Sequence, residues 1–197
     1  MSEQPPPQRP QPPPPSGPGG EAEAPASPPL READVREVAL ADTRALRQAV
    51  LRPHQTLDQL AAEEHPGAHA EGAFEHGELV AVGIVHEDGE RTRWRVRGMA
   101  TAPAARGRGL GAAVLAALVA YARAHGALLI WCNARTPARR LYERAGFTVV
   151  SAQFELPHIG PHVRMQLELP PPGDAPAART QSLTQKSVPS IDILNGI

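Results

Sequence analysis

The sequence predicts a single α/β domain: a mixed, centrally splayed sheet of six or seven strands with helices on both faces. Two observations carry this prediction. Segments of alternating polar and apolar residues, typical of strands, are interspersed with segments of helical period, and over 93–132 a strand, a helix and a second strand follow one another as in a right-handed parallel crossover. A hairpin precedes this unit, so antiparallel and parallel pairs share one sheet.

The two ends of the chain differ in composition from the patterned segment 31–169, which has the size of one domain. Twelve of the 23 prolines fall in the first 29 residues, where too few apolar side chains offset the entropy of ordering. We therefore expect 1–30 to be a disordered proline-rich arm and 170–197 to be a disordered tail. The arm lacks the pattern of a secretory signal and no apolar stretch has the length of a membrane helix, so the expected location is the cytoplasm.

Charge and composition exclude several classes of site. A formal net charge of -1 disfavours nucleic-acid binding by bulk positive charge. The single cysteine, Cys132, excludes an internal disulfide, and a cysteine in an apolar strand is more often core than nucleophile. The histidine pairs His65/His69 and His158/His162 are interrupted by proline and glycine, so neither places two metal ligands on one helical face. We expect no metal, no nucleic-acid partner and no membrane partner.

The first half of the domain is predicted to contain a strand, two helices and a hairpin, at 35–40, 42–51, 57–64, 68–74 and 79–86. Asp42 is the expected N-cap of the first helix, which ends before Pro53. Gly77 lies in the polar turn that a hairpin requires.

The second half begins with the strand 93–101, in which alternation buries one face and leaves three arginines on the other. Apolar residues at helical spacing then predict a helix over 108–125, with Gly126 as its left-handed stop. The apolar run 128–132 is expected to be a strand that is covered on both faces. The remaining expected elements are a helix at 137–144 and strands at 147–154 and 163–169.

A glycine-rich turn leads directly into the long predicted helix. Because Gly107, Gly109 and Gly111 have no side chains, the backbone can approach an anion closely, and the helix N-terminus adds free N–H groups and a partial positive charge. Arg106 and Arg108 add formal charge. The turn therefore predicts a diphosphate site, with an ordinary tight turn and solvated arginines as the alternative.

Two motifs in this region resemble those of a known family. Arg106-x-x-Gly109-x-Gly111 resembles the acetyl-CoA pyrophosphate loop, Q/R-x-x-G-x-G/A, of the GCN5-related N-acetyltransferases (GNAT), and 138–147 resembles their second signature, A-x-x-L-Y-x-x-x-G-F. The resemblance spans the patterned segment, with its specific motifs in 95–147. It implies the GNAT acyl-CoA N-acyltransferase fold, and transfer of an acetyl group from acetyl-CoA to an amine by direct attack in a ternary complex.

The resemblance also implies roles for individual residues. Tyr142 matches the tyrosine that protonates the departing coenzyme A thiolate, with a core tyrosine as the alternative. Asn133 is the candidate for a further pantetheine contact, because Arg135 stands where many members have asparagine. Backbone contacts to pantetheine fall to Met99, Ala100 and Thr101, and pyrophosphate binding falls to Arg106, Gly107, Arg108, Gly109, Leu110 and Gly111.

The acceptor is the least determined part of this interpretation. An ammonium group must lose a proton before it attacks, and the candidates for the base are Glu71, His158, His162 or a water molecule. The acceptor is expected to be a small-molecule or peptide amine, as in small bacterial members of the family. A homodimer, and an acetyl-CoA sensor of GNAT fold that does not turn its ligand over, stay open as alternatives.

Overall fold

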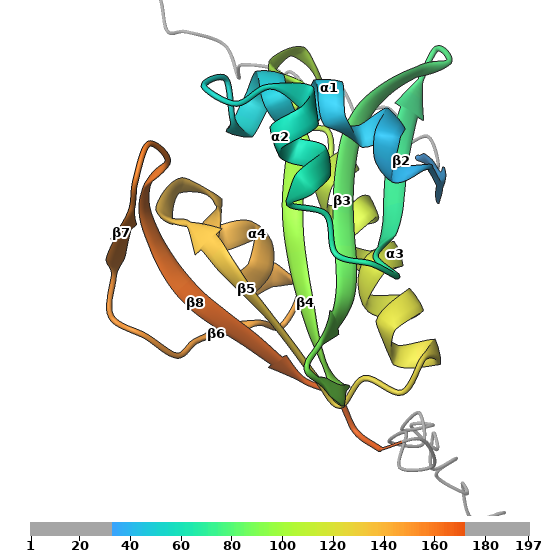
Figure 1. Cartoon of the computed structure of the whole chain (residues 1–197). Helices are drawn as coiled ribbons and strands as arrows, with labels where there is room; N and C mark the ends of the chain where they lie inside the picture. Colours follow the sequence, from blue (N-terminus) through green and yellow to red (C-terminus); the bar gives the residue numbers. More distant parts are fainter. Residues whose placement is uncertain (1–32, 172–197) are drawn as a thin grey trace, which may run out of the picture. The chain divides into compact units, whose positions relative to one another are not determined.

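The computed structural model describes residues 33–171 (Figure 1), so the predicted arm 1–30 and nearly all of the predicted tail 170–197 lie outside the described residues. The described chain forms an eight-stranded mixed sheet in the order β1-β2-β3-β4-β5-β8-β6, with β7 paired to β8. The predicted fold class is confirmed, but the sheet has eight strands instead of the predicted six or seven. The strands are β1 (Asp34–Glu37), β2 (His69–Glu75), β3 (Glu78–Asp88), β4 (Glu90–Thr101), β5 (Leu129–Arg135), β6 (Thr148–Val149), β7 (Phe154–Leu156) and β8 (Gly160–Glu168).

Helices cover both faces of the sheet, as predicted. They are α1 (Leu40–Leu51), α2 (Leu57–Ala62), α3 (Leu110–Ala124) and α4 (Arg139–Arg144). A Cβ atom on Gly83 of β3 would meet Val114 and Leu118 of α3, whereas one on Gly98 of β4 would meet Arg47 of α1. The two helices therefore lie against opposite faces of the middle strands, α1 in front and α3 behind in Figure 1.

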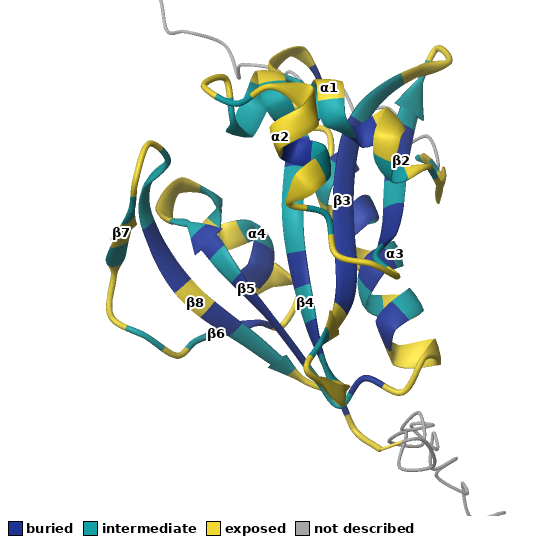
Figure 2. Ribbon diagram, viewed as in Figure 1, coloured by how far each residue is buried: buried dark blue, intermediate teal, exposed yellow. Residues whose placement is uncertain are grey.

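The core lies mainly between the sheet and α3. The buried side chains of α3 recur at the spacing that the sequence predicted, namely Leu110, Val114, Leu115, Leu118 and Ala122. Gly126 follows the helix with a φ of 88°, which fits the predicted left-handed stop. Figure 2 shows buried residues concentrated on the middle strands and exposed ones on α2 and the end of α3. No helix within 33–171 is long and apolar enough to cross a membrane.

The centre of the sheet is splayed. β4 and β5 run parallel, as predicted, but they pair only at three positions, from Arg93 with Leu129 to Arg95 with Trp131. Beyond these positions β4 stays with β3 and β5 stays with β8, and the two halves diverge (Figure 1). The divergence leaves one edge of each strand without a neighbouring strand, which opens a space in the middle of the domain.

A β-bulge bends β4 beside this opening. The register between β3 and β4 shifts between Val82 and Ile84, which pair with Ala100 and Arg97 respectively. Gly98, within the bulge, has a φ of 64°, and a Cβ there would lie 3.1 Å from Nε of Arg47. Glycine thus provides both the left-handed backbone and the close approach of α1 at this point.

The structure differs from the predicted elements in three places. The strand predicted at 35–40 ends at Glu37, because α1 begins at Leu40. Ala39 occupies the N-cap, so the prediction for Asp42 was wrong: this carboxylate lies in the first turn, where it interacts favourably with the helix dipole. The strand predicted at 147–154 is two strands, β6 and β7.

A side-chain hydrogen bond from β8 marks the interruption between β6 and β7. Ser151 Oγ accepts a hydrogen bond of 2.9 Å from the backbone N–H of Arg164 in β8. A side-chain acceptor thus takes the place of a backbone carbonyl in the ladder, and the chain leaves β8 until β7 rejoins it.

Candidate active site

Two adjoining cavities lie at the splay. The main cavity has a volume of about 600 Å³ and lies between the diverging strands, with α1 and α2 on one side and α4 on the other. The loop cavity, about 460 Å³, lies at the N-terminus of α3. Thr101, Arg106, Gly107 and Leu141 line both of them. One ligand can therefore extend from the start of α3 into the centre of the sheet.

The predicted anion-binding turn forms one wall of the loop cavity. Within the described chain, none of the five backbone N–H groups over 107–111 donates to a protein acceptor, whereas those of Ala112 and Ala113 both donate to the carbonyl of Gly109. Gly107 and Gly109 have φ values of 79° and 82°, which glycine adopts without strain. These donors and the positive end of the α3 dipole suit an anion with several oxygen atoms.

The two predicted arginines of this turn differ in position. Arg106 donates from Nε to the carbonyl of Thr101 at 3.3 Å and lines both cavities. Arg108 lines neither: its guanidinium is held by Glu75 at 2.7 Å and by the carbonyl of Ala104 at 2.9 Å. Only the backbone of Arg108 remains available for the predicted contact.

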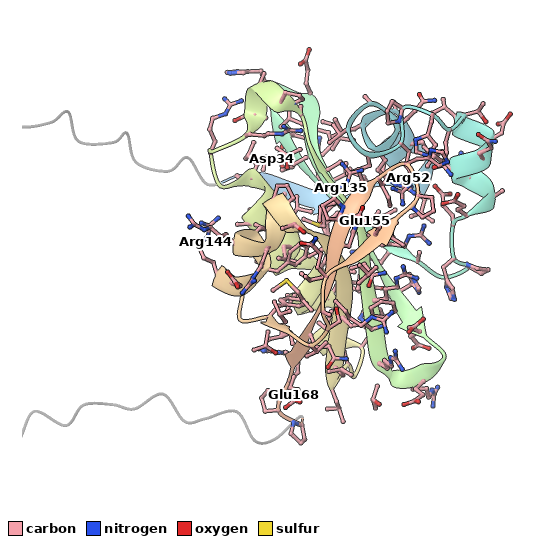
Figure 3. All side chains as sticks on the ribbon, turned by 90° about the vertical axis from the view of Figure 1, so that its left-hand side faces the viewer. Asp34, Arg52, Arg135, Arg144, Glu155 and Glu168 are labelled. Atoms are coloured by element: carbon pink, nitrogen blue, oxygen red, sulfur yellow. The ribbon has the colours of Figure 1, made fainter. Side chains whose placement is uncertain are left out.

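Sequence reasoning did not identify a further arginine that lines the loop cavity. Arg144, at the end of α4, lines this cavity, and Figure 3 labels it at the edge of the molecule. It stands at a variable position of the second signature, so the motif gave no signal. The helical spacing could have given one, because Arg144 lies three residues after Leu141 and so shares its helix face.

The predicted pantetheine residues lie along the main cavity with one exception. Met99, Thr101 and Asn133 line it, whereas the side chain of Ala100 is buried in the core at 3% exposure. Any contact from Ala100 must therefore come from its backbone. Asn133 faces Arg164 of β8, with Oδ1 and Nε 3.5 Å apart, which is a weak interaction that a ligand could replace.

Tyr142 lines the main cavity from α4 and is only 5% exposed. Its ring packs edge-on against Phe147, with centroids 5.6 Å apart, but its hydroxyl forms no hydrogen bond with any residue over 33–171. Burial, and to a smaller degree the neighbouring Cys132, raise the pKa of Tyr142 above that of a free phenol. The hydroxyl therefore stays protonated and is a donor available to a ligand.

Cys132 is not a candidate nucleophile. It is buried in β5, and burial raises the pKa of its thiol to about 12. The reactive form of cysteine is the thiolate, which is negligible at neutral pH when the pKa is this high. The structure agrees with the core position that the apolar strand predicted.

Only one of the three side chains considered for the base lines the main cavity. His162 does so, and its Nδ1 lies 2.7 Å from the carbonyl of Gly160. Since a carbonyl only accepts, Nδ1 carries the proton and Nε2 is the acceptor atom of the ring. Glu71 interacts with His69 at 2.8 Å, and His158 stacks on His54 with centroids 5.2 Å apart; both residues lie outside the cavity lining.

The main cavity is strongly cationic, and the sequence indicated only some of the arginines that line it. Its lining contains six arginines and a single acidic residue, Glu63. The three arginines of the strand 93–101 were visible in the alternation, but the contributions of α1 were not. The arginines that line this cavity are Arg47, Arg52, Arg95, Arg97, Arg106 and Arg135. No cluster of three or more histidine, cysteine or acidic residues that could hold a metal occurs within the described part of the chain.

The described chain thus combines a splayed mixed sheet, unpaired backbone N–H groups at the start of α3 and a tyrosine at the cleft. The comparisons with known proteins give the family. The profile of the acetyltransferase (GNAT) family matches residues 33–147, so the chain belongs to this family. It is accordingly an acyltransferase, and the predicted resemblance is confirmed.

Relatives share this fold at low sequence identity. An uncharacterised N-acetyltransferase of Bacillus subtilis, YitI, is 29% identical over 142 residues, which is 67% of this chain and 93% of that protein. The ribosomal-protein-S18-alanine N-acetyltransferase of Escherichia coli has a TM-score of 0.59 and 18% identity, over 72% of this chain and 97% of its own. The protein yncA of Salmonella typhimurium, solved with its cofactor acetyl-CoA, has a TM-score of 0.57 and 21% identity, over 75% of this chain and 99% of its own.

Proposed function

We propose that this acyltransferase moves an acetyl group from acetyl-CoA to an amine, by direct attack within a ternary complex in the cytoplasm. One observation carries the proposal: the run of unpaired backbone N–H groups over 107–111 opens into the same continuous space as Tyr142. A diphosphate bound to the N–H groups of 107–111 would direct an attached thioester arm toward Tyr142. The acetyl-CoA complex of the related yncA supports this choice of donor.

The arm of the donor would follow the free edge of β4. The pyrophosphate binds the N–H groups of the loop cavity, with Arg106 and Arg144 adding charge. Pantetheine carries amide groups, which can bond the backbone of Met99 to Thr101 as an added strand would. No metal takes part in this proposal, because amide, guanidinium and hydroxyl groups supply all of its contacts.

Tyr142 is proposed to stabilise the leaving sulfur. Because burial raises its pKa, the Tyr142 phenolate would be a stronger base than a thiolate, whose conjugate acid has an ordinary pKa of about 8.5. Complete proton transfer from the hydroxyl to the sulfur is therefore uphill. The role that fits is a strong hydrogen bond from the hydroxyl to the sulfur as the C–S bond breaks.

His162 is proposed as the base that receives the proton of the attacking amine, since Nε2 is its acceptor atom and the side chain lines the main cavity. Replacement of His162 with asparagine retains a donor toward the carbonyl of Gly160 but removes Nε2. We expect turnover to fall by ~10²-fold with little change in acetyl-CoA affinity. Steady-state kinetics and calorimetric titration measure the two quantities. The matched variant His158→Asn, outside the cavity, should keep wild-type turnover, and a fully active His162→Asn enzyme would assign the base to water.

The function itself is tested by incubating the purified full-length chain with acetyl-CoA and panels of amines, amino acids and peptides. The expected result is release of free coenzyme A thiol in equal amount to an N-acetylated product identified by mass spectrometry. Binding of acetyl-CoA without release across the panels would favour the sensor alternative. A folded protein that does not bind acetyl-CoA would refute the proposal altogether.

A further inference from the structure

We infer that the acceptor amine carries an oxyanion, a carboxylate or a phosphate, that binds Arg52 and Arg135 at the open end of the main cavity. This inference rests on the proposed function, because it names the class of substrate for the same site. It also goes further, since it excludes the neutral and polycationic amines that the chemistry of acetyl transfer alone would allow.

Two of the arginines that line the main cavity already have carboxylate partners. Arg47 is bonded to Glu64, with its Nη1 3.1 Å from Oε1, and the same carboxylate is bonded to Arg44 at 2.7 Å. Arg97 lies 3.5 Å from the carboxylate of Glu63 and donates to the Glu63 carbonyl at 3.1 Å. Each of these guanidinium groups thus has a carboxylate partner within the protein, and the bonds link α1 and β4 to the end of α2.

Arg52 and Arg135 have no such partner within the described chain. Arg52 lines the cavity, and its guanidinium has no hydrogen bond or ion pair to any residue over 33–171. Arg135 donates one bond of 2.8 Å to the carbonyl of Leu51, which leaves its other donors and its charge available. The two residues are labelled close together in Figure 3, and the charge of Arg135 acts on Arg52.

The surroundings of Arg52 are unfavourable to its charge. Burial lowers the pKa of Arg52, and the nearby cations Arg135, Arg97 and Arg47 lower it further, against a partial compensation by Glu63. A second cavity arginine is in a similar situation, since Nε of Arg95 is buried without a partner. An oxyanion bound here would relieve this repulsion, whereas a cationic acceptor without an oxyanion would add to it.

These arginines are not placed for the pyrophosphate of the donor. On β5, Cys132 and Ala134 are buried in the core that α3 shares, so the alternation puts Asn133 and Arg135 on the opposite face. Arg52 follows α1, which lies on that opposite face. Neither arginine lines the loop cavity, whose wall includes Gly107, Gly109, Leu110 and Gly111. The two anion sites therefore belong to different substrates.

The register of β5 and β8 limits the size of the acceptor. Arg135 pairs directly with His162, the proposed base, and both side chains line the main cavity. Side chains of directly paired residues begin roughly 5 Å apart. The amine at His162 and the oxyanion at Arg135 are thus separated by a short spacer, as in a free amino acid or an aminoalkyl phosphate.

The test compares acceptors that differ only in the oxyanion, using acetyl-CoA and the full-length chain. Free amino acids are compared with their carboxamides, and O-phosphoethanolamine is compared with ethanolamine. Spermidine serves as the polycationic acceptor. We expect kcat/KM to be at least ~10-fold higher for the acceptor that carries the oxyanion, since charge-assisted bonds to arginine are then made. The two pairs distinguish a carboxylate from a phosphate.

The variant Arg52→Gln should bring each ratio close to one while leaving acetyl-CoA affinity unchanged, and its melting temperature should stay near that of the wild type because Arg52 has no protein partner over 33–171. Arg140→Gln, on the exposed face of α4 and outside both cavities, should keep the wild-type ratios. A preference for carboxamides, ethanolamine or spermidine would overturn the inference. So would an Arg52→Gln enzyme that still discriminates.

A binding experiment tests the oxyanion site even if the protein shows no turnover. N-acetylated amino acids and their carboxamides are titrated calorimetrically into the complex of the protein with coenzyme A. Tighter binding of the free acid that is lost in Arg52→Gln supports the oxyanion site even if the proposed function fails. Turnover of neutral amines alone would leave the proposed function standing and refute the oxyanion site, and equal binding of acid and carboxamide would also refute it.

Discussion

Replacement of Gly109 with glutamate is expected to weaken acetyl-CoA binding by at least ~100-fold while the chain stays folded. Gly109 lines the loop cavity, and a Cβ there would meet no atom within 4 Å, so the new side chain extends into open space that the pyrophosphate needs. Two like charges about 4 Å apart repel by about 4 kcal/mol near a protein surface, whereas a 100-fold change requires only about 2.7 kcal/mol. The charge alone is therefore sufficient. Calorimetric titration measures the affinity.

The control for this variant separates charge from backbone strain. Gly109 has a φ of 82°, where a residue with a Cβ costs about 1 to 2 kcal/mol of the free energy of unfolding. Gly77, in the turn between β2 and β3, has a φ of 83° and equally open surroundings. Gly77→Glu should therefore show a similar loss of stability with unchanged acetyl-CoA affinity. Wild-type affinity in a folded Gly109→Glu protein would remove the diphosphate assignment of the loop.

The second large effect is expected for Tyr142→Phe, which should lower turnover by ~10²-fold. The substitution keeps the ring and its edge-on packing against Phe147. Because the hydroxyl has no hydrogen-bond partner over 33–171, its loss should leave the melting temperature almost unchanged. Acetyl-CoA affinity should also change little, since the proposed bond strengthens only as the sulfur gains charge. Turnover, melting temperature and affinity are measured on one preparation.

Tyr121→Phe is the matched control. Tyr121 lies on α3, stacks on His69 with ring centroids 3.6 Å apart, and lines neither cavity. Loss of its hydroxyl should leave turnover at the wild-type level. If Tyr142→Phe lost about 1 kcal/mol of stability with normal turnover, the tyrosine would be structural and its catalytic assignment would be withdrawn.

Sequence reasoning succeeded where the signal is local. The apolar spacing of α3 and the left-handed Gly126 depend on neighbours along the chain. The parallel pairing of β4 and β5 followed from the crossover rule, which needs only the order of strand, helix and strand. The family followed from two motifs at fixed spacing. The predicted roles of Tyr142 and the loop remain predictions, to be decided by the two variants above.

Sequence reasoning failed where distant partners compete for a side chain. Arg106 and Arg108 were both expected to add charge to the glycine-rich turn, but Glu75 of β2 lies close enough in space to pair with Arg108. The single strand expected at 147–154 was interrupted by a bond from β8 to Ser151, a contact that alternation cannot reveal. Arg52 follows α1 and Arg135 ends β5, so this cationic pair exists only once the fold brings the two residues together.

The short pairing of β4 with β5 has a consequence for self-association. Uncovered strand edges normally recruit strands from other molecules and lead to aggregation. Here the uncovered edges beyond Arg95 and Trp131 are recessed in a cavity of about 600 Å³. A foreign strand, with side chains on both faces, is too bulky to enter, whereas an amide-bearing chain without side chains is narrow enough. The splay thus admits a narrow chain and excludes a strand. The protein keeps a strand edge that can form hydrogen bonds, without the aggregation that an exposed edge promotes.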